Sequence, residues 1–136
     1  MSAQLRIIRT EAAPAPVAGA PYNQAVVAPA GELIFVSGQV PVDRETGQIV
    51  PGDVTAQSEQ VLINVAAVLS GAGATLNDVI KSTVFLIDIA NDFPLMNTVY
   101  AKHFGSHAPA RSTIGVAALP LGARVEIEVV ARVPSA

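Results

Sequence analysis

Apolar residues recur with a helical period in the middle of the chain. From Asp53 to about Ser70, apolar side chains return every three or four residues and form a single stripe. Asp53 is a good N-cap, because its carboxylate can accept an unpaired N–H of the first turn. Gly71 follows the stripe and is expected to stop the helix in a left-handed conformation. The pattern predicts an amphipathic helix with one buried face.

The same period returns further along the chain. A second helix is expected to start at Asp92, to tolerate Pro94 in its first turn, and to end near Gly105. Asn97 lies on or near the packing stripe of this helix, where a polar residue more often bonds a loop than a ligand. The stripe itself consists of Phe93, Met96, Tyr100 and Phe104.

Runs rich in β-branched and aromatic residues predict strands at both ends of the chain and one between the helices. The predicted strands are Leu5–Arg9, Tyr22–Ala28, Leu33–Val36, Asp78–Asp88, Ser112–Val116 and Arg124–Val133. The order is roughly ββ(β)αβαββ, which predicts an α+β fold with a mixed sheet and both helices on one face. The other face would then be apolar and exposed in a single chain, which indicates an oligomer.

Composition supports one domain over residues 1–136 that associates with itself. Hydrophobic residues make up 51% of the chain and charged residues 14%, and the mean hydropathy is +0.47. These few charged residues cannot cover the surface of a small globular protein. Part of its apolar surface is therefore expected to contact another subunit. The longest apolar runs, such as Val84–Ile87, are far shorter than the roughly 20 residues of a membrane-spanning helix.

Cysteine content and charge exclude several function classes. The chain has no cysteine, which rules out disulfides, thiolate metal sites and a cysteine nucleophile. The net charge is −3 and no run of Lys or Arg occurs, so nucleic-acid binding is not expected. Met1–Thr10 lacks the apolar core of a signal peptide, so the cytoplasm is the expected compartment.

The two histidines offer a weak metal-site candidate. His103 and His107 are four residues apart and could meet on one helix face as metal ligands. However, the helix is expected to end near Gly105, and no carboxylate stands at the spacing of a zinc-protease helix. Two solvated histidines at a helix end are therefore the favoured interpretation.

Arg111 is the more informative candidate, because it begins an otherwise uncharged strand. A guanidinium offers a planar fork of donors that matches a carboxylate and can orient an anionic substrate. From spacing alone, a structural ion pair with Glu126 or Glu128 is favoured instead. If the last two strands paired with Gly115 opposite Glu126, then Arg111, Thr113 and both glutamates would project to one side. The sequence leaves this register open.

Taken together, the motifs resemble those of the Rid (reactive-intermediate deaminase) family, formerly called YjgF. They are Pro21-Tyr22-Asn23-Gln24-Ala25, Phe35-Val36-Ser37-Gly38-Gln39-Val40-Pro41, Asn64, Asp92-Phe93, Asn97-x-x-Tyr100, Pro109-Ala110-Arg111-Ser112 and Leu119-Pro120 through Val125-Glu126-Ile127-Glu128. They occur in the family's order and cover the chain from about Ile7 to Arg132. The resemblance implies a chorismate-mutase-like fold that assembles as a homotrimer, with the sheets inside and the sites in clefts between subunits.

The resemblance also implies hydrolytic deamination of 2-imino and enamino acids, such as 2-iminobutanoate and 2-iminopropanoate, to 2-keto acids and ammonia. No cofactor or metal is implied. Arg111 matches the arginine that binds the substrate carboxylate, and Glu126 matches the glutamate that positions or activates the attacking water. Thr113 stands where well-known members carry cysteine. Other positions that match the lining of the same pocket are Tyr22, Ser37, Gly38 and Asn97.

Two alternatives stay open from the sequence. The cleft could hold a keto acid or another carboxylate without turnover, as a binding or regulatory module, or it could deaminate a pathway-specific imine. Glu126 favours catalysis, because binding a carboxylate does not require a second carboxylate nearby. The segment 105–108 is shorter than in typical members and is expected to border the cleft, which leaves the preferred substrate size open. A ribonuclease is not expected, because an acidic chain with 4% aromatic residues offers little for phosphate contact or base stacking.

Overall fold

The computed structural model describes residues 4–134, except for the side chain of Ala18. The described chain follows the predicted order of strands and helices, with strand bounds that shift by a few residues. The order is β1 (Arg6–Ile8), β2 (Ala25–Val27), β3 (Leu33–Gln39), α1 (Val54–Ser70), β4 (Val79–Leu86), α2 (Ile89–Phe104), β5 (Ala110–Gly115) and β6 (Val125–Arg132). Short 3-10 turns occur at η1 (Val17–Gly19), η2 (Leu76–Asp78) and η3 (Pro120–Gly122).

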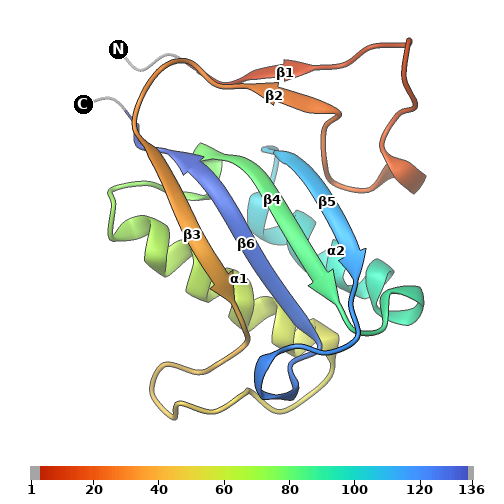
Figure 1. The fold of residues 1–136 in the computed structure, drawn as a ribbon, viewed down its shortest axis with the longest axis vertical. Coiled ribbons are helices and arrows are strands. Elements are labelled where there is room, and N and C mark those ends of the chain that lie inside the picture. The colour runs from red at the N-terminus through yellow and green to blue at the C-terminus, as the bar shows by residue number, and fades with distance from the viewer. Residues whose placement is uncertain (1–3, 135–136) are drawn as a thin grey trace.

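Strands β3 to β6 form a mixed sheet in the order β3-β6-β4-β5. β6 is antiparallel to both of its neighbours, whereas β4 and β5 are parallel and are connected through α2. Both helices lie behind one face of this sheet, and the hairpin-like pair β1–β2 stands at one end of it (Figure 1). The predicted α+β class, with two helices on one face of the sheet, is confirmed.

The first helix begins as its sequence predicts. Asp53 Oδ1 accepts hydrogen bonds from the backbone N–H groups of Thr55 and Ala56 at 3.0 and 3.2 Å. The predicted left-handed stop at Gly71 is wrong, because Gly71 keeps a right-handed φ of −60°. The chain turns two residues later, where Gly73 has a φ of +74°.

The second helix begins earlier than predicted, at Ile89 rather than Asp92. Pro94 therefore lies beyond the first turn. Asp92 is not a capping residue: it is buried, and its Oδ2 accepts hydrogen bonds from Arg124 Nε and Nη2 at 3.1 and 2.9 Å. This ion pair fixes the start of α2 against the residue that precedes β6.

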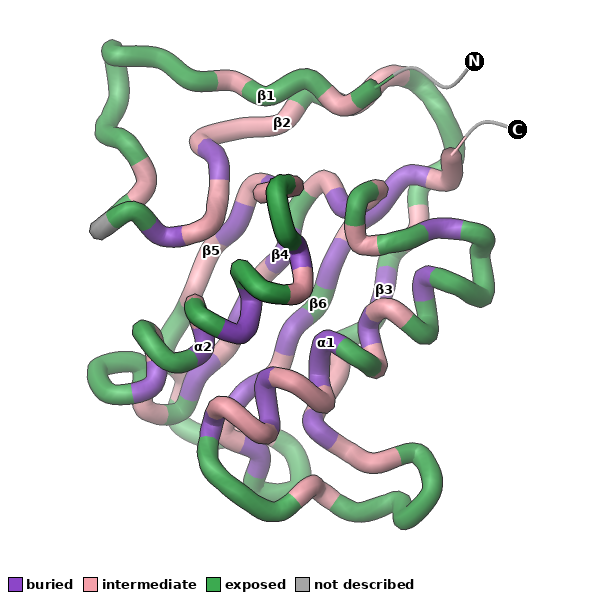
Figure 2. The backbone as a smooth tube through the Cα atoms, turned by 180° about the vertical axis from the view of Figure 1, so that it is seen from behind, coloured by how far each residue is buried: buried purple, intermediate pink, exposed green. Residues whose placement is uncertain are grey.

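The core lies between the two helices and the sheet face that they cover. Figure 2 shows buried stretches of β4 and β6 behind the helices. Within the core, the hydroxyls of Ser82 and Tyr100 are 2.6 Å apart, which satisfies both polar groups. The largest fully buried apolar side chains include Leu62, Leu69, Leu86, Met96 and Ile127.

The opposite face of the sheet, here called the open face, carries exposed apolar side chains. Phe35 of β3 is 74% exposed, and Leu33 and Ile114 are about half exposed. Glu126 and Glu128 of β6 share this face, because they alternate with the buried Val125, Ile127 and Val129. The exposed apolar side chains on this face agree with the expectation of self-association, while the trimer itself stays a prediction. No helix in residues 4–134 is long and apolar enough to cross a membrane.

The suggested pairing of the last two strands is wrong. β5 does not contact β6 in the ladder, because β4 lies between them. Gly115 lies opposite Leu86, and Glu126 lies opposite Phe85. Arg111 lies opposite Ser82, whose side chain points into the core beneath α2. Arg111 and Glu126 therefore project to opposite faces of the sheet.

Candidate functional site

Arg111 lies on the edge strand β5, on the helix side of the sheet, and is only 7% exposed. Its Cζ atom is 4.8 Å from the ring centroid of Tyr100, 5.3 Å from that of Tyr22 and 5.7 Å from that of Phe93. Tyr100 and Phe93 come from α2, and Tyr22 comes from the segment before β2. Three aromatic rings thus surround one guanidinium and stabilise its charge through their faces.

Both terminal nitrogens of this guanidinium, Nη1 and Nη2, are buried without a hydrogen-bond partner. The expected ion pair with Glu126 or Glu128 is not formed, because those carboxylates lie on the other face. Burial lowers the pKa of Arg111, while Tyr100 and Tyr22 act in the opposite direction. An arginine remains charged in proteins, and aromatic faces cannot accept its in-plane N–H groups as a carboxylate would. Such an arrangement can bind a planar anion such as a carboxylate only through these two free nitrogens, which donate hydrogen bonds to it.

A cavity of about 390 Å³ opens beside Arg111. Its volume lies near the lower end of the range for small-molecule sites, which suits a small organic acid. Thr113 also lines it, and the Thr113 hydroxyl is buried without a partner. The lining residues are Val17, Tyr22, Ile89, Phe93, Arg111, Ser112 and Thr113.

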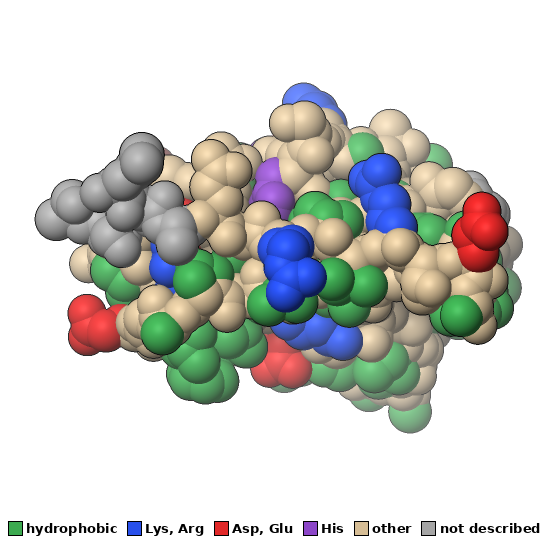
Figure 3. Space-filling model, turned by 90° about the horizontal axis from the view of Figure 1, so that it is seen from above, with side chains coloured by type: hydrophobic (Ala, Val, Ile, Leu, Met, Phe, Trp, Pro, Cys, Tyr) green, Lys and Arg blue, Asp and Glu red, His purple; other side chains and the backbone are tan. Residues whose placement is uncertain are grey.

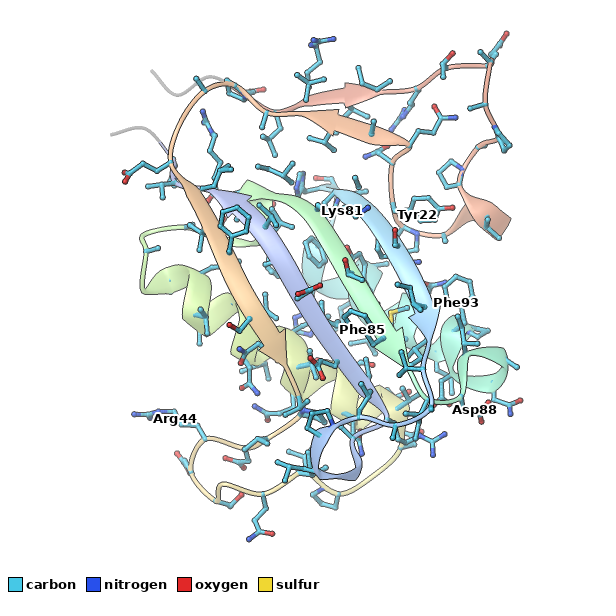
Figure 4. The ribbon with its side chains drawn as sticks, in the orientation of Figure 1. Tyr22, Arg44, Lys81, Phe85, Asp88 and Phe93 are labelled. Atoms are coloured by element: carbon cyan, nitrogen blue, oxygen red, sulfur yellow. The ribbon has the colours of Figure 1, made fainter. Side chains whose placement is uncertain are left out.

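Tyr22 forms one wall of this cavity. Its hydroxyl accepts a hydrogen bond from the Val17 backbone N–H at 2.8 Å. The following residue, Asn23, anchors the segment to the start of β5 through a backbone bond from its N–H to Pro109 O at 3.1 Å. Tyr22 lies beside the start of β5 and Phe93 further along the same edge (Figure 4).

Asn97 lies on the face of α2 that looks toward Arg111. It stands four residues after Phe93 and three before Tyr100, and both of those rings contact the guanidinium. Its Oδ1 atom is buried without a hydrogen-bond partner, so the expected bond to a loop is absent from that atom. Asn97 is not among the residues that line the cavity beside Arg111, so its unpaired acceptor lies behind that lining.

The other predicted site residues lie on the open face. Glu126 is opposite Phe85 of β4, and its side chain fills the space beside Gly38 of β3. A Cβ at residue 38 would collide with Glu126 Oε2 and lie 2.8 Å from its Cδ, so only glycine allows this approach. Ser37 precedes Gly38 and is exposed. Within one chain, the sheet therefore lies between the Arg111 cavity and the pair formed by Gly38 and Glu126.

Phe93 was missed as a site residue. The sequence assigned it to the packing stripe of the second helix, and an aromatic side chain that faces a guanidinium has the same spacing as one in a core. Phe93 stands four residues before Asn97, so the two share one helix face. This spacing was the signal in the sequence that could have placed Phe93 beside the candidate site.

The histidines do not form a shared site. His103 Nε2 is 2.6 Å from Glu59 Oε2, and His107 Nε2 is 2.7 Å from the Val79 carbonyl oxygen. The interpretation of both as simply solvated is wrong, because each has its own partner on the protein. Within residues 4–134, no three His, Asp or Glu side chains gather as a metal site would require.

The chain is similar to known proteins in both sequence and structure. Residues 10–133 match the sequence model of a family described as Endoribonuclease L-PSP. A RutC family protein of Pyrococcus horikoshii is 50% identical over 125 residues, which cover 92% of this chain and 95% of the relative. A protein of Capra hircus named 2-iminobutanoate/2-iminopropanoate deaminase is 47% identical over 126 residues, which cover 93% and 88%. The crystal structure of the YjgF gene product of E. coli superposes with a TM-score of 0.70 at 44% identity, over 93% of this chain and 98% of that one.

Proposed function

The chain belongs to the Rid family of YjgF-like proteins, and from that membership and the cavity at Arg111 we propose that it hydrolyses small 2-imino and enamino acids to 2-keto acids and ammonia. We propose 2-iminobutanoate and 2-iminopropanoate as its substrates, because a relative at 47% identity is named as the deaminase of these two compounds. A pathway-specific imine stays the alternative substrate.

One observation carries the proposal: Arg111 holds two buried, unpartnered nitrogens inside an aromatic enclosure. A substrate carboxylate would accept a hydrogen bond from each nitrogen and remove the penalty of leaving them unpaired. The neighbouring side chains of Val17, Ile89 and Phe93 are apolar and suit the methyl or ethyl group of a short imino acid.

The complete site, in this proposal, needs two copies of the chain. Arg111 and Glu126 lie on opposite faces of one sheet, so a single chain cannot bring both to one substrate. A neighbour that covers the β5 edge with its own open face would place its Gly38 and Glu126 at the mouth of the cavity. The exposed Phe35 and Ile114 supply apolar surface for such an interface. A closed ring of three copies repeats the contact and forms a homotrimer with three identical sites.

The chemistry follows from this arrangement. Arg111 fixes the carboxylate, and the iminium carbon beside it is already electrophilic, so the scheme uses no cofactor. Glu126 of the neighbouring copy accepts a proton as water adds to that carbon. The carbinolamine then transfers its hydroxyl proton to nitrogen, and the C–N bond breaks to release ammonia and the keto acid. Glu126 returns its proton to solvent, where ammonia can take it up. Figure 3 shows Lys and Arg side chains at the β1–β2 end, with other side chains between them. The proposed reaction involves no nucleic acid. We keep the cytoplasm as the proposed compartment.

The test is release of 2-oxobutanoate from 2-iminobutanoate that a threonine dehydratase generates in the same vessel. We expect the wild type to accelerate release, and Arg111→Ala to lose about 10²-fold or more of the acceleration because the carboxylate is no longer fixed. Arg44→Ala is the matched control: Arg44 is exposed on the β3–α1 loop, across the sheet from Tyr22 (Figure 4). Full activity of the Arg111 variant would refute the mechanism. A wild type that binds 2-oxobutanoate without accelerating hydrolysis would establish the binding module instead.

A further inference from the structure

An enamine substrate poses a problem that Arg111 and Glu126 do not solve. Its C2 atom is electron-rich until C3 accepts a proton, and only then does the iminium that water attacks exist. Arg111 is occupied with the carboxylate, and Glu126 accepts a proton rather than supplying one. An acid is therefore required in the cavity.

The lining of the cavity offers few candidates. Among its described residues, the only ionisable side chains are Tyr22 and Arg111. The hydroxyls of Ser112 and Thr113 are aliphatic and are far weaker acids than a phenol. Lys81 donates to Ser112 Oγ at 3.2 Å but is itself outside the lining, and both histidines have partners elsewhere.

The hydrogen bonding of Tyr22 leaves its proton available. The Val17 backbone N–H can only donate, so in their 2.8 Å contact the Tyr22 oxygen is the acceptor. The phenolic hydrogen is consequently free to be given to a ligand. Val17 and Tyr22 both line the cavity, so this contact is part of its wall.

The same contacts fix the Tyr22 side chain beside the carboxylate-binding group. The Val17 N–H donates directly to the Tyr22 oxygen, and the Arg111 guanidinium lies 5.3 Å from the centroid of the Tyr22 ring. Arg111 also fixes the carboxylate of the substrate, which places C3 only two bonds further along the chain.

We propose that Tyr22 is a catalytic residue that protonates C3 of enamine substrates, an inference that rests on the proposed deaminase function. The Tyr22 O–H bond breaks, and its proton forms a C3–H bond with the π electrons of C2=C3. The nitrogen lone pair then forms C2=N, which gives the iminium and a phenolate. After water adds, the proton accepted by Glu126 returns to the phenolate through solvent, and both residues regain their initial states.

The experiment follows the stereochemistry of the new C–H bond in D₂O. Threonine dehydratase supplies 2-aminocrotonate, and a lactate-type dehydrogenase reduces the product at once, so that the configuration at C3 is preserved. Protonation by a fixed Tyr22 should deliver deuterium to one face of C3, whereas protonation in solution gives both configurations equally. The dehydratase without the deaminase defines the background.

Tyr22→Phe should yield equal amounts of both C3 configurations when the substrate is the enamine. The same variant should still accelerate hydrolysis of 2-iminopropanoate that is produced directly by oxidation of alanine. Val17→Pro is the matched control, because it removes the same hydrogen bond but keeps the hydroxyl. Residue 17 begins the η1 turn after Pro16, where ψ is 138°, so proline fits there. This variant should be slower but should retain the stereochemistry.

Three results would overturn the role of Tyr22 while leaving the deaminase intact. They are an accelerating wild type that gives no stereochemical preference, a Tyr22→Phe protein that keeps the preference, or a Val17→Pro protein that loses it as Tyr22→Phe does. A wild type that accelerates neither substrate would overturn the deaminase function itself, and the proposal with it.

Discussion

Gly38 and Glu126 are in direct contact on the open face of the sheet, and the contact depends on the missing side chain of the glycine. A Cβ at residue 38 would meet the carboxylate and lie 3.2 Å from Glu126 Cγ. The glycine is therefore required for the space that it leaves, since its φ is not in the left-handed region. β3 thereby helps to determine where the carboxylate of β6 can lie.

Gly38→Ala should move the Glu126 carboxylate without unfolding the protein, because the colliding atoms belong to the end of a flexible side chain. We expect kcat for 2-iminobutanoate to fall by about 10²-fold, as for other small displacements of a reacting group. KM should change little, because Arg111 still binds the carboxylate. Steady-state kinetics on the assembled variant provide the measurement.

The control is Gly31→Ala, at the other end of β3. Its Cβ would lie 3.3 Å from the stem of Arg132, which is also a flexible neighbour. This variant should keep the wild-type kcat. Equal losses in the two alanine variants would show that Gly38 acts through general packing and not through Glu126.

Thr113→Val should separate stability from function. The Thr113 hydroxyl is buried without a partner, so replacing it with a methyl group of similar size removes an unsatisfied polar group. We expect the free energy of unfolding to rise by about 1 kcal/mol, while KM rises because a ligand-binding group is lost. Urea denaturation and kinetics on the same preparation test both effects. A fall in stability with unchanged KM would assign the hydroxyl to the fold.

Glu59 should make a small contribution to stability that disappears in acid. Hydrogen bonds from Lys102 and then His103 lower the pKa of Glu59 below its ordinary value of 4.5. A carboxyl whose pKa is lower in the folded state stabilises that state above its unfolded pKa, and the stabilisation is lost as pH falls through the folded pKa. The side chain is 31% exposed, so we expect less than about 1 kcal/mol.

Comparison of the wild type with Glu59→Gln tests this. The stability difference between the two proteins should be present at pH 7 and should be lost as the pH falls below 4.5, through the lower pKa of Glu59 in the folded protein. Lys102→Met removes the larger of the two hydrogen-bond effects on the pKa of Glu59. In this background, Glu59→Gln should change the free energy of unfolding by less than it does in the wild type. A stability difference that persists at pH 2 would show that Glu59 acts through packing or neutral hydrogen bonds.

The parts of the fold that depend on neighbours in sequence were predictable. The cap at Asp53 involves groups two and three residues away, and the apolar stripe of α1 is a local repeat. Asp92 was misinterpreted as a helix start because its actual partner, Arg124, is 32 residues distant. The pairing of β5 and β6 failed for a similar reason, since β4 inserts between them and no local pattern records this.

The candidate site was predictable only through the resemblance of its motifs. Spacing alone favoured an ion pair for Arg111, and only the three-dimensional arrangement shows its two nitrogens without partners. Phe93 and Tyr100 have the pattern of ordinary packing residues, yet their rings also surround the guanidinium. The separation of Arg111 from Glu126 follows from the strand order and the pairing register, which no local pattern in the sequence records.

In the proposed mechanism, Arg111 of one copy and Glu126 of the next act on the same substrate. Mixed assemblies of Arg111→Ala and Glu126→Gln chains test it most directly, because neither variant alone has an intact site. In a ring, each contact joins Arg111 of one chain to Glu126 of its neighbour, so equal mixing should restore about a quarter of the wild-type rate on 2-iminobutanoate. Mixed assemblies no more active than the two parent variants would contradict a shared site, and with it the proposed mechanism.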